Sequence, residues 1–283
     1  MMKAIFLDVD GTLTDYEGNI PESAIRAIQQ ARRNGHKVFT VTGRSKAEMY
    51  EDILAIGFDG YIGGNGSYVE LDNQVLFEQV LSKTDAKEIV DWLHQQELEF
   101  FLESNHGLFA SKNFKEAGRA PLQAYSAYKG KDNAEHVTVE QVFPEMIYDG
   151  ELYRADLNKV SFILNAYEDY LQARQRFPHL KVGTWGGAGE QALFGDIGVA
   201  NIDKGKAIDI ILQHIGIKRE DSIAFGDAKI DIPMLEYCGT GVAMGSGGTE
   251  IKSMADYVAK DVQQDGLYHG FVHLGLIEGE SKL

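Results

Sequence analysis

The sequence is poor in cysteine and in long apolar segments. Cys238 is the only cysteine among 283 residues, so the chain can form no internal disulfide and no zinc site built from several thiolates. No apolar run approaches the roughly 18–20 residues of a membrane span. The N-terminus reaches an aspartate after four apolar residues, which is too short for a signal peptide. We therefore expect a cytoplasmic globular protein.

Positive charge is also scarce. Lysine and arginine number 27 against 43 aspartates and glutamates, which gives a formal net charge of −16. A field of this sign repels nucleic acid and anionic membranes, so neither is expected as a partner. It also repels phosphorylated metabolites, so an anionic ligand needs local compensation by a cation, by lysine or arginine, or by helix N-termini.

Short apolar strands alternate with amphipathic helices near both ends of the chain. Residues 4–7 and 37–41 have the composition of buried strands, and a helix between them begins near Glu22. Late in the chain, Asp203 is placed to cap a helix that ends at Gly216. This alternation predicts an α/β fold with a Rossmann-like parallel sheet covered by helices on both faces.

The middle of the chain has a different pattern. Helical periodicity at 85–96 and 168–176 alternates with the strand-like segments "FFLES" and "KVSFILN". We therefore predict that residues 83–183 form an inserted α+β domain. Residues 1–82 and 184–283 are then the two parts of the core domain.

Polar residues follow four of the predicted core strands. They are Asp8 and Asp10, Thr42 and Arg44, Asn65, and Asp227 and Asp231. The carboxyl ends of parallel strands form one rim, where ligands bind. Several carboxylates on one rim need a counter-ion, and Mg²⁺ binds through carboxylates and substrate phosphate. The residues thus predict a metal, a phosphate cradle and a carboxylate that is able to act as a nucleophile.

Four motifs occur in a fixed order along the chain. They are "DVDGTLTD", "TGR", "DKGKA" and "GDAKIDIPML", and "GGNGSYV" follows the third strand. Together with the inserted domain, this order resembles the haloacid dehalogenase superfamily, and within it the Cof-type phosphatases with a type IIB cap. The resemblance covers nearly the whole chain.

The resemblance implies catalytic and metal-binding roles for four aspartates. Asp8 would attack phosphorus and form an aspartyl-phosphate, and Asp10 would protonate the leaving alcohol and later activate water. Asp227 would bind Mg²⁺ together with Asp8 and the backbone carbonyl of Asp10, and Asp231 would support the metal through water. Mg²⁺ is thus the expected cofactor.

The resemblance also implies a phosphate-binding set. Thr42 and Lys204 would hold the phosphoryl oxygens, with backbone N–H groups near Gly11 and Gly43. The rim arrangement itself supports this, because Lys204 begins a predicted helix at the end where anions bind well.

Two further residues are candidates for contact with the substrate, each with a competing interpretation. Asn65 lies in an Asn–Gly pair, which is typical of a turn. Arg44 could instead pair with a nearby acid. The fourth motif also departs from the family, which usually has asparagine where this chain has Ile230. That difference predicts a weaker metal site.

We expect a Mg²⁺-dependent phosphomonoester hydrolase that acts on a small phosphorylated metabolite, either a sugar phosphate or a phosphorylated cofactor. One alternative is a phosphomutase, which needs a second phosphate site in the cap. The segment "KNFKEAGR" supplies Lys112, Lys115 and Arg119 there, but no dense arginine cluster. The other alternative is a non-catalytic phosphate-binding regulator, favoured only by Ile230. Substrate choice is expected to depend on the cap, and the sequence leaves the oligomeric state open.

Overall fold

The computed structural model describes residues 2–187 and 189–279 and divides the chain into two compact units. The first unit contains Met1–Gly43, Tyr50–Glu78 and Ile202–Leu283, and the second contains Arg44–Met49 and Gln79–Asn201. Positions 1 and 280–283, at the ends of the predicted core domain, lie outside the described residues.

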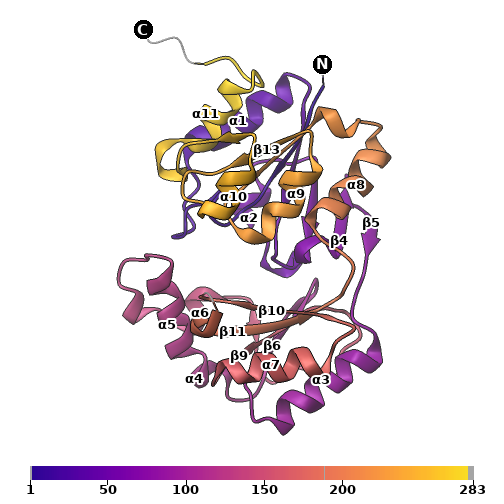
Figure 1. The fold of residues 1–283 in the computed structure, drawn as a ribbon, viewed down its shortest axis with the longest axis vertical. Helices are drawn as coiled ribbons and strands as arrows, with labels where there is room; N and C mark the ends of the chain where they lie inside the picture. Colours follow the sequence, from indigo (N-terminus) through magenta and orange to yellow (C-terminus); the bar gives the residue numbers. More distant parts are fainter. Residues whose placement is uncertain (1, 188, 280–283) are drawn as a thin grey trace. The chain divides into compact units, whose positions relative to one another are not determined.

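The first unit is built on an eight-stranded sheet with the order β14-β13-β12-β1-β2-β3-β4-β5 (Figure 1). These strands are β1 Ala4–Leu7, β2 Lys37–Val41, β3 Gly60–Gly63, β4 Tyr68–Leu71, β5 Gln74–Glu78, β12 Ser222–Gly226, β13 Thr240–Ala243 and β14 Tyr257–Val258. The strands from β14 to β3 are parallel, as predicted, and β1 lies at the centre between β2 and β12.

One edge of this sheet departs from the parallel arrangement. Strands β4 and β5 run antiparallel to their neighbours. Asp72 and Asn73 form the two-residue turn between them, and both have positive φ, 48° and 62°. Such a turn joins only antiparallel strands, because a parallel crossover needs a much longer connection.

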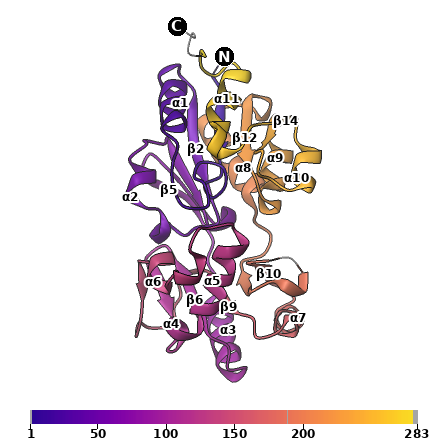
Figure 2. The same ribbon diagram turned by 90° about the vertical axis from the view of Figure 1, so that its left-hand side faces the viewer.

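Helices cover both faces of this sheet. They are α1 Glu22–Arg33, α2 Glu51–Leu54, α8 Lys204–Ile215, α9 Ile232–Tyr237, α10 Thr249–Met254 and α11 Gly266–His273. Helices α8, α9 and α10 bury their apolar residues against one face, where Phe6 and Phe39 stack with ring centroids 5.0 Å apart. On the other face Phe225 contacts Phe271 of α11, and α11 lies beside α1 (Figures 1 and 2).

The predicted boundaries of two core helices are confirmed. Helix α1 begins at Glu22 directly after Pro21, and its buried stripe is made mainly of small side chains. Helix α8 begins at Lys204, where the side chain of Asp203 accepts the N–H of Lys206 at 2.8 Å. It ends at Gly216, whose φ of 68° is costly for a residue with a side chain.

The second unit is an α+β unit with a six-stranded sheet in the order β10-β11-β9-β6-β7-β8. Its strands are β6 Phe100–Ser104, β7 Gly107–Ala110, β8 Met146–Ile147, β9 Leu157–Ile163, β10 Lys181–Trp185 and β11 Phe194–Gly198. Its helices are α3 Lys83–Gln95, α4 Phe114–Ala117, α5 Arg119–Tyr128, α6 Val139–Val142 and α7 Tyr167–Arg176. Aromatic side chains fill its interior, as in the edge-on contacts of Trp92 with Phe162 and Phe177.

The predicted boundaries of the inserted domain need two corrections. Residue 183 lies inside β10, and β11 pairs with β9 from Phe194↔Ile163 to Gly198↔Lys159, so the second unit runs to Asn201. The segment Arg44–Met49 also belongs to the second unit. Its Lys46 N–H donates to Asn105 Oδ1 at 3.0 Å, which anchors it there.

Within the described part of the chain, no helix combines the length and apolar character needed to cross a membrane.

Candidate active site

Three aspartates meet at the carboxyl ends of the central strands of the first unit. Asp8 directly follows β1, Asp227 directly follows β12, and Asp231 lies four residues further on. Because β1 and β12 are hydrogen-bonded neighbours, their ends are held side by side, and the Asp8 N–H donates to Phe225 O at 3.0 Å. One carboxylate oxygen of each aspartate lies within 4.8 Å of the other two. All three side chains are buried.

Lys204 joins two of these carboxylates. Its Nζ lies 2.6 Å from Asp8 Oδ1 and 2.5 Å from Asp231 Oδ1, and only 1% of the residue is exposed. The start of α8 places it there, because the Asp203 cap fixes the first turn of the helix. Burial opposes a charged lysine, but the Asp231 and Asp8 carboxylates raise the pKa of Lys204 above its ordinary value. It is therefore a fixed cation.

One lysine does not balance three buried carboxylates. Burial raises the pKa of Asp8 well above its ordinary value, the charges of Asp231 and Asp227 add to this rise, and Lys204 opposes it. The carboxylate of Asp8 therefore needs more positive charge to stay ionised at neutral pH. Closely spaced carboxylate oxygens are the donors that Mg²⁺ prefers, so the residues present fit a magnesium ion.

Asp231 also closes the loop that carries Asp227. Its Oδ2 accepts the backbone N–H groups of Asp227 and Ala228 at 3.1 and 3.0 Å. Ile230 lies in the same loop with 40% of its surface exposed. Ile230 is therefore not buried, and Asp231 holds the loop.

Two hydroxyl groups hold Asp227, and the sequence did not reveal either of these contacts. Thr12 Oγ1 donates to Asp227 Oδ1 at 3.2 Å, and Tyr16 OH donates to Asp227 Oδ2 at 2.5 Å. Gly11 lies against the same carboxylate, since a Cβ at this position would come within 2.4 Å of Oδ2. Gly11 has a φ of 95°, which also favours glycine.

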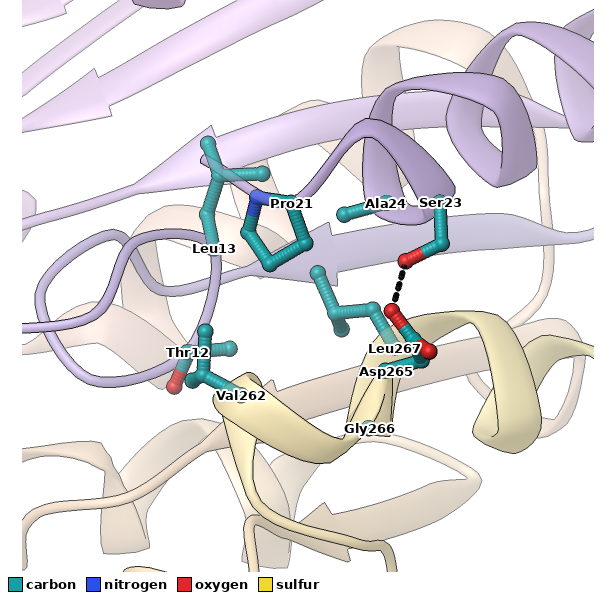
Figure 3. Close-up of a pocket in the computed structure, with 9 residues that line it drawn as sticks. All are labelled: Thr12, Leu13, Pro21, Ser23, Ala24, Val262, Asp265, Gly266 and Leu267. Carbon is teal, nitrogen blue, oxygen red and sulfur yellow. Dashed lines mark hydrogen bonds between the residues drawn. The ribbon is translucent and has the colours of Figure 1, made fainter. Parts of the chain in front are cut away.

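The loop after β1 rests on two other parts of the first unit. In Figure 3, Thr12 lies beside Val262 and Leu13 lies beside Pro21, at the beginnings of the short helix Val262–Gln264 and of α1. Next to them, Ser23 Oγ donates to Asp265 Oδ1 at 2.5 Å. The loop after β1 therefore packs against the beginnings of both helices.

The other predicted site residues lie outside the three-aspartate cluster. Asp10 is exposed, and its carboxylate is not part of the three-aspartate cluster. Thr42 and Gly43 follow β2, the strand next to β1, so they lie at the same rim as Asp8. Thr42 is buried, and its N–H donates to Ile62 O at 2.9 Å.

Asn65 is a turn residue with an unusual side-chain oxygen. It has a left-handed φ of 56°, as its Asn–Gly context indicates, and its N–H donates to Thr42 O at 3.0 Å. Its Oδ1 is buried and has no hydrogen-bond partner among the described residues. This atom lies close to Gly43, where a Cβ would come within 3.0 Å of it.

Arg44 belongs to the second unit, where its Nη1 donates to Glu48 O at 3.2 Å. The buried carboxylate of Glu48 accepts both the N–H and the hydroxyl of Ser45, at 2.7 and 2.9 Å. Burial raises the pKa of Glu48 to about 7, and the charge of the nearby Glu103 adds to the rise. Lys159 lies 3.0 Å from Glu103 and compensates one of these carboxylates.

Comparison with known proteins shows the family of the chain. The haloacid dehalogenase-like hydrolase family matches residues 5–271, which include all of the motifs. The chain belongs to this family.

Relatives match along the whole chain. The Bacillus subtilis (strain 168) protein YkrA is 28% identical over 278 residues, which cover 98% of this chain and 99% of YkrA. Phosphatase YwpJ of the same strain is 25% identical, with coverage of 96% and 100%. The solved structure of a sugar phosphatase of haloacid dehalogenase subclass IIB has a TM-score of 0.75 at 26% identity, with coverage of 98% and 100%. These relatives support a phosphatase of the haloacid dehalogenase type.

Proposed function

We propose that the protein is a Mg²⁺-dependent hydrolase of a small phosphomonoester that works through an aspartyl-phosphate on Asp8. The observation that carries this proposal is the buried cluster in which Lys204 bridges Asp8 and Asp231 beside Asp227. An ordinary strand end does not concentrate three buried carboxylates around one lysine. The cluster has the charge and the donors to hold a phosphate, a divalent cation and a nucleophile together.

In the first step a carboxylate oxygen of Asp8 attacks phosphorus. An oxygen–phosphorus bond forms on Asp8, the bond to the substrate oxygen breaks, and Asp10 donates a proton to the departing alcohol. In the second step Asp10 takes a proton from water, which attacks the same phosphorus and releases phosphate and free Asp8. The exposure of Asp10 suits this exchange of protons with alcohol and water.

Phosphoryl transfer depends mainly on positioning and on neutralising charge. Lys204, the Thr42 hydroxyl and the backbone N–H groups near Gly11 and Gly43 are assigned to the phosphoryl oxygens. A Mg²⁺ ion would be held by the carboxylates of Asp8 and Asp227, by the backbone carbonyl of Asp10 and by Asp231, through water. When bound, it supplies the positive charge that the cluster lacks.

The substrate proposed is a phosphorylated sugar. This choice rests on the sugar phosphatase of subclass IIB, whose whole chain this protein covers. Asn65 is a candidate contact, because its buried Oδ1 can accept a hydroxyl that the described protein does not provide. Arg44 is the second candidate. We assign substrate choice to the inserted second unit, and a cytoplasmic location without a nucleic acid or membrane partner is part of the proposal.

A phosphomutase is disfavoured by the ion pairs of the second unit. Its second phosphate site would need the basic side chains of the segment 112–119. Lys115 pairs with Glu140, and Arg119 lies 3.5 Å from Glu116. Both cations are therefore partly neutralised. The non-catalytic alternative needs a defect in the cluster, and Ile230, which suggested one, lies at the surface of its loop.

The test measures phosphate release from a panel of sugar phosphates and phosphorylated cofactors, with Mg²⁺ and with EDTA. Wild type should release phosphate only with Mg²⁺, and Asp8→Asn should lose at least ~10³-fold in rate, as expected for removal of a nucleophile. Isomerised sugar phosphate without release would support the mutase. Activity that persists in a cleanly purified Asp8→Asn protein would refute the aspartyl-phosphate mechanism.

A further inference from the structure

We infer that Tyr16 is a positioning residue for the metal site, through its hydrogen bond to Asp227. This inference rests on the proposed function, since it assumes that Asp227 binds Mg²⁺. Tyr16 belongs to none of the motifs, and it lies in the loop between β1 and α1 that also carries Asp8. Its hydroxyl lies 2.5 Å from Asp227 Oδ2 although the two residues are 211 positions apart in the chain.

The backbone around Tyr16 is fixed by hydrogen bonds within the first unit. Asp15 Oδ1 accepts the N–H groups of Glu17 and Asn19 at 2.9 and 2.8 Å, and the Asp15 N–H donates to Asn19 O at 3.0 Å. On the other side of Tyr16, the Thr14 N–H donates to Val9 O at 2.9 Å. The turn therefore presents the tyrosine ring to Asp227.

The contacts of Asp227 leave its carboxylate little rotational freedom. Thr12 donates to one oxygen, Tyr16 donates to the other, and the backbone of Gly11 lies against the group. Each carboxylate oxygen has two lone pairs, so a hydrogen bond from a hydroxyl does not by itself prevent the same oxygen from binding a cation. The hydroxyl groups thus orient Asp227 while they leave it able to bind a metal.

This arrangement couples the nucleophile to the metal ligand. Asp8, Thr12 and Tyr16 belong to one continuous loop, whereas Asp227 comes from the end of β12. A shift of the loop would move the nucleophile and the orientation of Asp227 together. Partners of this kind, which hold a metal ligand in place, typically change metal affinity by ~10–100-fold when they are removed. Phenylalanine at position 16 should therefore weaken Mg²⁺ binding.

The first measurement is Mg²⁺ binding by isothermal titration calorimetry without any phosphate ester. We expect Tyr16→Phe to bind Mg²⁺ at least ~10-fold more weakly than wild type. The matched control is Tyr237→Phe. The Tyr237 hydroxyl also donates to an aspartate at 2.5 Å, namely Asp209, in the same unit but outside the cluster. This control should bind Mg²⁺ like wild type.

A second measurement separates orientation from general stability. The Mg²⁺ concentration for half-maximal rate should rise in Tyr16→Phe by the same factor as the dissociation constant, while kcat at saturating Mg²⁺ stays near wild type. The melting temperature in EDTA should fall only slightly, as for the loss of one hydrogen bond, so Tyr16→Phe should stay folded under the assay conditions. A large fall in the melting temperature together with a lower kcat at saturating Mg²⁺ would mean a merely structural role.

The outcomes distinguish the two proposals. If wild type binds Mg²⁺ and Asp227→Asn does not, but Tyr16→Phe binds as wild type does, only the positioning role is refuted. Tighter binding by Tyr16→Phe also refutes it, since the hydroxyl then competes with the ion. If wild type and Asp227→Asn bind Mg²⁺ equally, the metal site fails, and the positioning role fails with it.

Discussion

Glu48 offers a test of buried charge in the second unit, because its protonation should make stability depend on pH. The side chain is 9% exposed and accepts two hydrogen bonds from Ser45. Glu103 adds a second negative charge nearby, and Lys159, 3.0 Å from Glu103, is the adjacent cation. Glu48→Gln keeps an oxygen that can accept from Ser45 but removes the charge.

The size of this effect on the free energy of unfolding follows from the pKa of Glu48, which rises from 4.5 to about 7 in the folded protein. The folded protein then binds a proton more tightly than the unfolded chain. The contribution of Glu48 to the free energy of unfolding is therefore fully present below pH 4.5 and is lost as the pH rises through 7. The whole decrease is about 3 kcal/mol, at about 1.4 kcal/mol for each pKa unit. Glutamine does not titrate, so Glu48→Gln should lack this decrease.

The assay is urea unfolding of both proteins between pH 4.5 and pH 8. Glu48→Gln should gain stability relative to wild type across this range, by up to about 3 kcal/mol at the upper end. Glu236→Gln, on the exposed surface of α9, is the control for a lost charge. A difference between Glu48→Gln and wild type that is the same at every pH would show that Glu48 ionises as an ordinary carboxyl and would refute the reasoning.

Three further predictions concern the first unit. Asp10→Asn should lower the rate by ~10²–10⁴-fold, as for loss of a general acid–base group, but leave the Mg²⁺ affinity near that of wild type. If calorimetry shows that Asp10→Asn loses as much Mg²⁺ affinity as Asp227→Asn, the proton-transfer role of Asp10 is contradicted. Ile230→Asn should lower the Mg²⁺ concentration for half-maximal rate without lowering the melting temperature, because the position is exposed; no gain at any Mg²⁺ concentration would refute the predicted deficit. Gly11→Ala should weaken Mg²⁺ binding in calorimetry, since the Cβ would meet Asp227 within 2.4 Å; wild-type affinity would contradict this.

Local signals in the sequence were sufficient for the core helices and strands. The Asp203 cap and the Gly216 stop bracket α8 as predicted, because both act on adjacent backbone. Strand β11 was assigned to the wrong domain. Its partner β9 lies more than thirty residues earlier in the chain, and local sequence patterns do not indicate a pairing between such distant segments. Gly195 makes β11 look like a loop, yet a Cβ there would come within 2.3 Å of the Phe162 ring. The glycine is thus part of the packing of the second sheet.

At the site, too, local patterns in the sequence were informative, but contacts between distant segments were not. Asp8, Lys204 and Asp231 could be expected to meet, because each follows a strand or begins a helix at one rim. The contact between Tyr16 and Asp227 could not, because it depends on the turn that Asp15 closes. Neither the spacing nor the residue type of a lone tyrosine indicates such a partner.

The central place of β1 has a consequence for the order of events during synthesis. Strand β1 pairs with β2 and β12. Strand β2 emerges from the ribosome soon after β1, but β12 emerges only after the whole second unit. Until then the nascent first unit presents an unpaired apolar strand edge, which is a site for mispairing and aggregation. The second unit has all of its strands once Asn201 has been made, so it can fold earlier. The cluster of Asp8, Asp227, Asp231 and Lys204 needs β1, β12 and α8 together, so it is then among the last parts of the protein to form.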